Sequence, residues 1–351
     1  MMSQLPQPFR PGRPAGLAGP ARLADPRRLS RRRGFAAAVA AAGALALTGC
    51  DALQVAQPEA PEVPPPSKVA AQPDQAAEFL AGYSDRLGEA LGQDGEGLED
   101  LQAAPLLERT QAELLIAEAS DETLASMSYV DIIPAAPMLS EYPLWFIAVA
   151  TPYNAEESRQ IMLVSRENAA GSWRVNQTAF LQADAVPVFL GDGEGAVEPA
   201  EPGFTERARQ AEEQLAGFLA GGDEPSAAAV DSQAFQDYRD YQGELSDPEN
   251  GFDDVSAECA PYSSSQEPLL ERALSTQDGA IALGEVRCTL QISVGEEFAL
   301  NLGPAVEAVM TGDGTGNTVQ VSTSHPYVVT ETDGELTLRA TDWYLLEAVT
   351  D

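Results

Sequence analysis

The side chains that most often do chemistry are scarce in this sequence of 351 residues, which has three cysteines and one histidine. A Ser-His-acid hydrolase would have to use His325, yet no G-x-S-x-G motif occurs, and Gly82–Arg86 lacks the final glycine. Lys68 is the single lysine, which argues against S-x-x-K acylases and Schiff-base enzymes. One histidine is too few for the usual His-rich zinc site. We therefore expect no catalytic residue, metal or cofactor.

Three further features have structural interpretations. His325 precedes Pro326, so we expect it at a turn or strand edge on the surface. Segment 312–317 is expected to be a turn, because a dinucleotide fingerprint needs a strand followed by a helix, and Ser324 replaces the glutamate of an EF-hand loop. The acidic stretch 244–254 has no regular ligand spacing and is expected to be a solvated loop, with calcium binding left open.

Cys50 lies at the end of an export signal. Basic residues at 27–33 precede an apolar run at 34–47, which is too short to span a membrane. The run ends in Leu47, Thr48, Gly49 and Cys50, which resembles the lipobox of bacterial lipoproteins. The resemblance implies a diacylglycerol on the sulfur of Cys50, which becomes the first residue of the mature chain. The alternative is a chance cysteine after an ordinary signal peptide.

The export route has two interpretations. Arg32, Arg33 and Phe35 match the centre of the twin-arginine motif, and a weakly apolar, Ala-rich segment suits that route. The alternative is an ordinary Arg-rich leader that uses the general secretory pathway.

Cys259 and Cys288 remain if Cys50 carries lipid. An even number of remaining cysteines in an exported protein indicates a disulfide. The bond would close a loop of about 30 residues and add roughly 3–4 kcal/mol to the free energy of unfolding on the chain-entropy model. Two free thiols or a metal pair are the alternatives, although no histidine cluster or CxxC motif accompanies them.

The charge excludes some partners. The formal net charge is −35, and removal of the leader's eight arginines and one aspartate leaves 12 basic against 54 acidic residues, a net charge of −42. Such a body lacks the basic face that nucleic acid or anionic lipid would require. Residues 50–73 carry six prolines and form an extended tether, so attachment to the bilayer must come from the lipid on Cys50.

The sequence after the tether predicts two α+β halves. In the first half, helical spacing begins after Asp74, a candidate N-cap, and continues to about Ala119 with a break at Pro105. In the second half it begins after Thr205, a second candidate N-cap, and recurs around Phe235–Tyr241. Strands are expected at 144–149, 161–164, 173–181 and 286–294. In the last of these, Val286 to Val294 alternate with a wet face that includes Glu285, and Asp333-Gly334 predicts a hairpin.

Helices followed by an antiparallel sheet resemble the cystatin-like and nuclear-transport-factor-2-like folds. The segments at 142–149, 172–175 and 276–280, with the C-terminal hairpin, also resemble a family of actinobacterial lipoproteins of unknown function. That resemblance implies a role in the cell envelope and transfers no active site.

The expected organisation is α+β, with two tandem helix-then-antiparallel-sheet halves. It comprises a signal peptide (1–49), a Pro-rich tether (50–73), a first domain (74–190), an acidic linker (191–202) and a second domain with the disulfide (203–351). We expect a lipid-anchored, exported protein at the outer face of the cell membrane, which acts as a non-enzymatic binding or scaffold module for an envelope protein. A small-ligand carrier with a pocket between helix and sheet is the alternative, followed by a carboxylate-dependent enzyme in that pocket.

Overall fold

The computed structural model describes residues 68–350 except 154, 156, 192–195, 248, 250–251, 263–268, 296–302 and 312–315. Several predicted residues lie outside this part of the chain, namely Arg32, Arg33, Phe35, Leu47, Thr48, Gly49 and Cys50. Most of the tether and most of the turn at 312–317 also lie outside it. In the described part, no helix is long and apolar enough to cross a membrane.

The N-terminal portion forms three helices and a four-stranded antiparallel sheet in the order β2-β4-β5-β6. The helices are α1 (Pro73–Leu91), α2 (Leu98–Leu101) and α3 (Leu106–Ala119). The strands are β2 (Tyr129–Ala135), β4 (Leu144–Pro152), β5 (Ser158–Arg166) and β6 (Arg174–Gln182), with β1 (Lys68–Val69) and β3 (Met138–Leu139) as a separate pair. The three strands predicted in this portion and the break at Pro105 are confirmed.

Both faces of this sheet are covered. Phe146 and Met162 pack in one apolar cluster with Leu80 of α1. Ile147 and Leu163 point to the opposite face and pack against the second sheet. Burial on both sides explains why β4 is a continuous apolar run.

The C-terminal portion forms a larger sheet with two long helices. Its main strand order is β11-β14-β12-β10-β8, while β13 pairs with β12 and β7, and β9 pairs with β10. The helices are α4 (Pro202–Leu219), α5 (Gln233–Leu245) and the short α6 (Pro304–Ala308). The strands are β7 (Ala229–Val230), β8 (Asp254–Pro261), β9 (Leu274–Thr276), β10 (Gly279–Ser293), β11 (Met310–Thr311), β12 (Thr318–Thr332), β13 (Glu335–Arg339) and β14 (Tyr344–Thr350).

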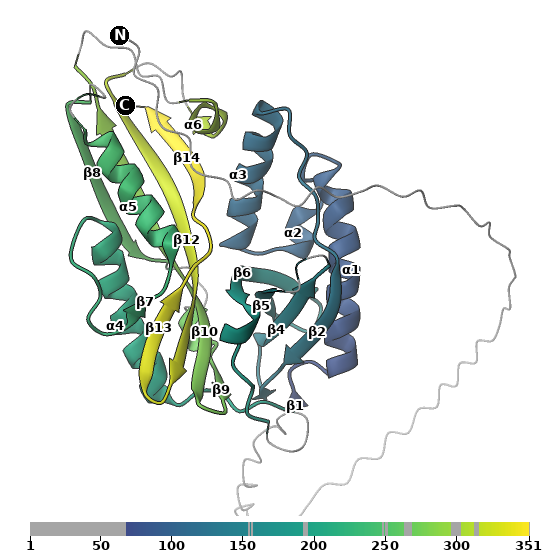
Figure 1. Ribbon diagram of the computed structural model, residues 1–351. Helices are drawn as coiled ribbons and strands as arrows, with labels where there is room; N and C mark the ends of the chain where they lie inside the picture. Colours follow the sequence, from purple (N-terminus) through teal and green to yellow (C-terminus); the bar gives the residue numbers. More distant parts are fainter. Residues whose placement is uncertain are drawn as a thin grey trace, which may run out of the picture. The chain divides into compact units, whose positions relative to one another are not determined.

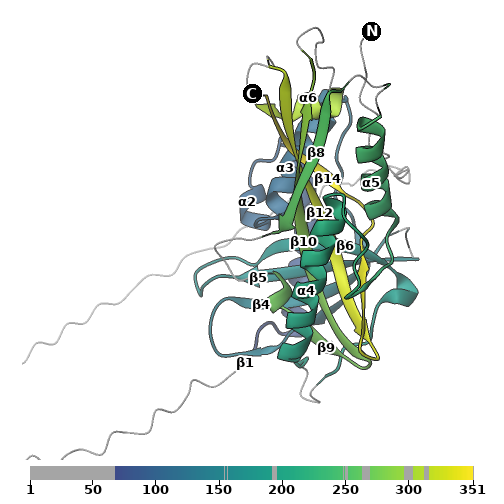
Figure 2. The ribbon, with the colours of Figure 1, turned by 90° about the vertical axis from the view of Figure 1, so that its left-hand side faces the viewer.

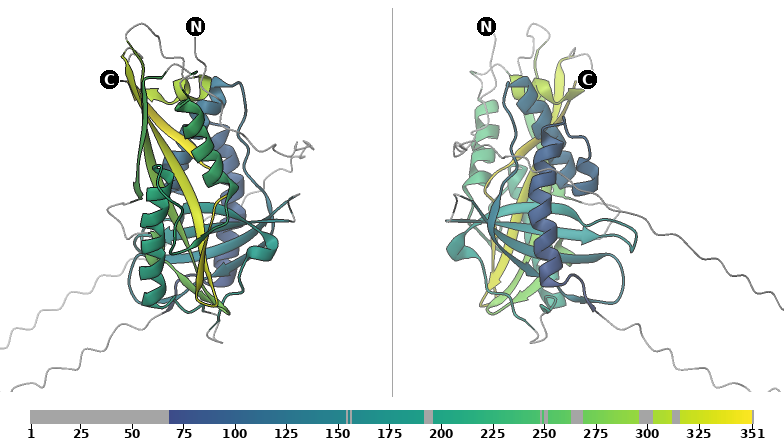
Figure 3. Two further views of the ribbon diagram at one scale, coloured as in Figure 1. Left: turned by 60° about the vertical axis from the view of Figure 1, so that its left-hand side comes forward. Right: turned by 90° about the vertical axis from the view of Figure 1, so that its right-hand side faces the viewer.

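The two sheets pack face to face between helices (Figure 1). Helices α4 and α5 cover the outer face of the larger sheet at different heights along its long strands (Figure 2). Helix α1 covers the outer face of the smaller sheet, whose strands run across those of the larger sheet (Figure 3). Helix α3 lies beside β14, so the N-terminal helices also contact the larger sheet.

Local predictions near the turns are partly confirmed. Asp333-Gly334 forms the β12–β13 hairpin, and both residues have positive φ values, as a two-residue turn of this kind needs. Both N-cap predictions are wrong. Helix α1 begins at Pro73 after Gln72, and α4 begins at Pro202 after Glu201, because proline is favoured in the first turn. Asp74 and Thr205 therefore lie inside these helices.

The α+β class is confirmed. In each portion the first long helix (α1 or α4) precedes the strands of the larger sheet of that portion, although β7 precedes α5 and α6 follows β10. The described residues belong to one compact unit. Whether each portion folds alone, and whether they are tandem copies, stay predictions.

Candidate functional site

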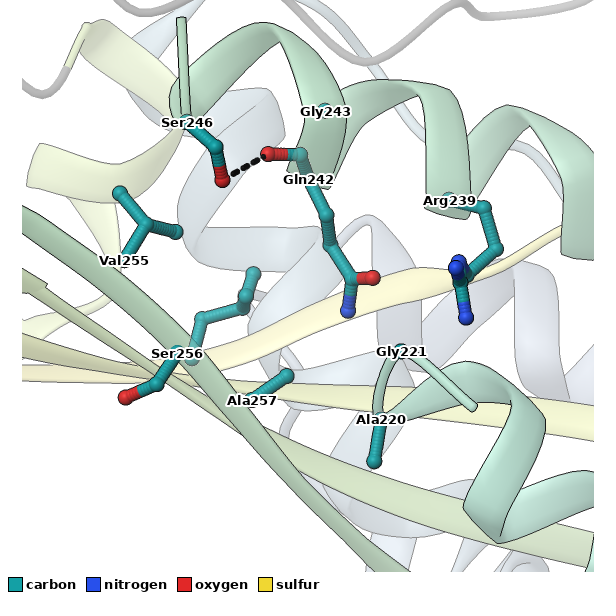
Figure 4. Close-up of a pocket in the computed structure, with 10 residues that line it drawn as sticks. Ala220, Gly221, Arg239, Gln242, Gly243, Ser246, Val255, Ser256 and Ala257 are labelled. Atoms are coloured by element: carbon teal, nitrogen blue, oxygen red, sulfur yellow. Dashed lines mark hydrogen bonds between the residues drawn. The ribbon is translucent and has the colours of Figure 1, made fainter. Parts of the chain in front are cut away.

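A groove opens between the C-terminal ends of α4 and α5 and the face of β8. Its volume is about 420 Å³, and Val255, Ala257 and Leu290 form its apolar floor. Ala220 and Gly221 line one wall, while polar side chains of α5 line the other (Figure 4). The residues that line it are mostly small, and Val255 and Ala257 of the floor are half-buried, whereas Leu290 is fully buried.

Side chains of α5 hold the end of α4 in place. The last carbonyls of a helix lack intrahelical donors. Gln242 Nε2 donates to the Leu219 carbonyl at 2.8 Å, and Arg239 donates to the carbonyls of Phe218 and Gly222. Gly221 turns the chain with a φ of 107°, which favours glycine. The groove wall is therefore preorganised, and the Arg239 charge is directed at backbone carbonyls.

The surface around the groove is strongly acidic. Segment 220–262, which contains α5 and β8, has eleven Asp and Glu residues and a single basic residue, Arg239. Asp223, Asp254 and Glu258 are among the exposed carboxylates. In the described parts of the chain, no group of three or more His, Cys, Asp or Glu side chains could hold a metal ion.

A second cavity of about 610 Å³ opens between α3 and the turn that follows α1. Leu114 and Leu115 of α3 contribute apolar surface, and Asp94 and Glu118 contribute charge. This cavity lies in the N-terminal portion, away from the groove.

A buried polar cluster joins the two sheets. Gln177 of β6 donates to Glu285 of β10 at 2.5 Å and accepts from Arg109 of α3 at 3.3 Å. Glu285 also pairs with Arg287, whose NH2 group reaches Glu108 at 2.8 Å at the exposed rim. The prediction that Glu285 lies on a wet face is wrong: it is 1% exposed because β6 and α3 cover this part of β10.

Glu212 of α4 is a second buried carboxyl group. Its carboxyl group lies beside the Tyr327 hydroxyl and accepts a hydrogen bond from the backbone N–H of Glu285. Burial raises the pKa of Glu212 from 4.5 to about 7. Neither Glu212 nor Glu285 lines either cavity.

His325 is fully buried, so its predicted place at an exposed turn or edge is wrong. It lies in the interior of β12, opposite Val286, and packs 4.2 Å from the Tyr238 ring. Its Nε2 is 2.9 Å from Thr323 Oγ1. Burial lowers the pKa of His325 to about 3, so the ring is neutral. Pro326 fits inside this strand without ending it.

The predicted Cys259–Cys288 disulfide is present. The two residues face each other on β8 and β10, with their Cα atoms 4.0 Å apart. Cys288 is buried beneath the helices, as its alternation predicted, and Cys259 is half-buried beyond Ala257 on the same face of β8. The groove residues Arg239, Gln242 and Val255 were not predicted, although the alternation of β8 could have revealed the strand.

Over residues 68–345 the sequence matches a family described as a domain of unknown function (DUF8094). The chain belongs to this family. The DUF8094 match begins in β1 and ends in β14, so it includes both sheets and the groove. No curated protein and no solved structure matches the chain. The family description gives no activity, and the function has to be inferred from the geometry.

Proposed function

We propose that the protein is an exported lipoprotein, held at the outer face of the cell membrane by acylated Cys50, whose body is a non-enzymatic binding module. The order of basic region, apolar run and lipobox supports the anchor. The Cys259–Cys288 disulfide supports export, because such bonds persist in oxidising compartments. An acidic body would be repelled by anionic lipid, which makes the acyl chain necessary for localisation.

The observation that carries the binding role is the groove over β8. Its floor is apolar, its wall is fixed by the contacts of Arg239 and Gln242, and it is open to solvent. Preorganised concave surfaces of this kind bind with little ordering cost. The partner we propose is another protein of the cell envelope.

A small-ligand carrier is the second candidate, because the groove lies between helices and a sheet. Carriers usually enclose most of the ligand surface, whereas this groove is open. A carboxylate-dependent enzyme has less support, since Glu212 and Glu285 lie outside the walls of both cavities.

We also infer that the two portions are tandem helix-then-sheet halves, and that the relatives are actinobacterial lipoproteins. The long helix that precedes the sheet in each portion, α1 in the first and α4 in the second, supports the first inference. The lipobox and the segments at 142–149 and 172–175 support the second.

Anchoring is tested with Cys50→Ala. The unaltered chain should enter the membrane fraction and incorporate a labelled fatty acid, whereas the variant should do neither. Equal membrane retention of the variant would contradict the anchor.

Binding is tested with a photocrosslinking residue at Ser246, an exposed residue that lines the groove, in whole cells, and a matched residue at exposed Glu78 on α1 is the control. We expect one envelope protein to be captured from position 246 and not from position 78. Capture of the same proteins from both positions would contradict a specific role for the groove. A co-purified small molecule in native mass spectra would favour the carrier.

A further inference from the structure

Strand β8 is an edge strand. It pairs with β10 along one side, and no other described strand pairs with its opposite side. An edge strand exposes a row of unpaired backbone donors and acceptors, to which an extended segment of another protein can add as a further strand. The edge is eight residues long, which is enough for such pairing.

The two faces of β8 differ in chemistry. Asp254, Ser256 and Glu258 are exposed on one face. Val255 and Ala257 face the helices, yet they are only half-buried, because the groove between α4 and α5 lies above them. A strand added beside β8 would thus meet carboxylates on one face and apolar surface on the other.

The acidic charge of segment 220–262 indicates which kind of partner the β8 edge would bind. Segment 220–262 has a formal net charge of −10, and its one basic residue, Arg239, donates to the carbonyls at the end of α4. A second copy of this chain would bring the same acidic edge and would be repelled. An extended segment that carries lysine or arginine would be attracted and would place its cations opposite Asp254 and Glu258.

We propose that the β8 edge and the adjoining groove bind an extended, cationic segment of a partner protein by strand addition. Basic side chains of the segment alternate with small apolar ones, which lie beside Val255 and Ala257 at the groove. This inference rests on the proposed binding function and names the partner class.

The test uses the purified, lipidated chain in detergent and a fluorescent acetyl-(Lys-Val)₄-amide peptide, whose length of about eight residues matches β8. We expect saturable binding by fluorescence anisotropy. The peptide with every backbone nitrogen methylated keeps its charge but lacks the donors, so it should bind at least about tenfold more weakly. Equal affinity for the two peptides would overturn strand addition.

Two variants locate the site. Asp254→Asn with Glu258→Gln should weaken binding roughly 2- to 30-fold, since each opposite-charge pair across strands contributes modestly. Gly243→Phe should weaken it at least about tenfold, because a side chain at this groove position meets open space and would fill the groove.

Matched variants on α1 are the controls. Glu78→Gln with Asp85→Asn removes two exposed charges, and Gly82→Phe adds a ring at another helical glycine with open space. Both should leave affinity within about twofold. An equal loss for both pairs of acid variants would show non-specific attraction, and undiminished binding to Gly243→Phe would place the site elsewhere. Either result would overturn the inference.

The outcomes also separate the two proposals. If the peptide does not bind while position 246 captures one envelope protein in cells, strand addition is wrong and the binding role stands. If position 246 captures nothing as well, both proposals are wrong.

Discussion

Gln177 of β6 donates a hydrogen bond of 2.5 Å from its Nε2 to Oε2 of Glu285 on β10, which joins the two sheets across 108 residues of sequence. Both side chains are buried, so the interaction replaces solvent that neither residue can reach. It also fixes how the smaller sheet and α3 rest on the larger sheet.

Substitution of Gln177 should therefore destabilise the fold. Gln177→Met keeps the volume but leaves the Glu285 carboxylate without one donor, at a cost of about 1–3 kcal/mol in the free energy of unfolding. Urea denaturation measures the change. Gln291→Met, at an exposed position of β10, is the control and should change stability by less than about 0.5 kcal/mol. Similar losses for both variants would contradict this role.

Glu212 should make stability depend on pH. Its folded pKa of about 7 lies above the unfolded value of 4.5, so the folded state holds the proton more tightly. This contribution is fully present below pH 4.5 and is lost as pH rises through about 7, by on the order of 3 kcal/mol. Glu212→Gln should remove that decline in urea titrations, while Glu213→Gln at the exposed neighbour should retain it. Parallel curves for the wild type and Glu212→Gln would refute the assignment.

His325 should make stability depend on pH in the direction opposite to Glu212. Its folded pKa of about 3 is below the ordinary value of 6.5, so stability is present above pH 6.5 and falls as the unfolded chain takes up the proton. The loss should reach about 2 kcal/mol at pH 5. His325→Gln should be less stable at pH 7 but should lack this slope between pH 6.5 and 4.5. A variant that keeps the wild-type slope would show that another group titrates.

Gly284 leaves room for the ring of Tyr327, its direct partner on β12. A Cβ at residue 284 would clash with Cζ and Oη of that ring. Gly284→Ala should cost about 1–3 kcal/mol in the free energy of unfolding. The double variant with Tyr327→Leu should recover part of the loss in a double-mutant cycle. Gly243→Ala, where space is open, should instead stabilise α5 by up to about 1 kcal/mol.

The strands that the sequence predicts are those with unambiguous patterns. The apolar run at 144–149 and the alternation from Val286 to Val294 are both confirmed in β4 and β10. The same alternation misplaced Glu285, because a period of two identifies a polar face but not what covers it. The burial of Glu285 depends on Gln177 and Arg109, which are remote in sequence.

The groove could not be predicted from the sequence for a related reason. Its shape depends on where the hydrogen bonds of Arg239 and Gln242 hold the end of α4 against α5, and no local pattern encodes that placement. Strand β8 was not predicted, because its acidic residues favour a loop. Its residues Val255, Ala257 and Cys259 nevertheless alternate with exposed ones, as in a half-buried strand.

The short pair of strands β1 and β3 would be the first part of the fold to bear a pulling force applied from the N-terminal side. Lys68 and Val69 pair with Leu139 and Met138, and this pair forms a sheet of its own. A pull applied at Lys68 would open these few hydrogen bonds before it reached α1. Because β1 and β3 belong to neither of the two larger sheets, opening this pair would leave the pairing of β8 with β10 in place.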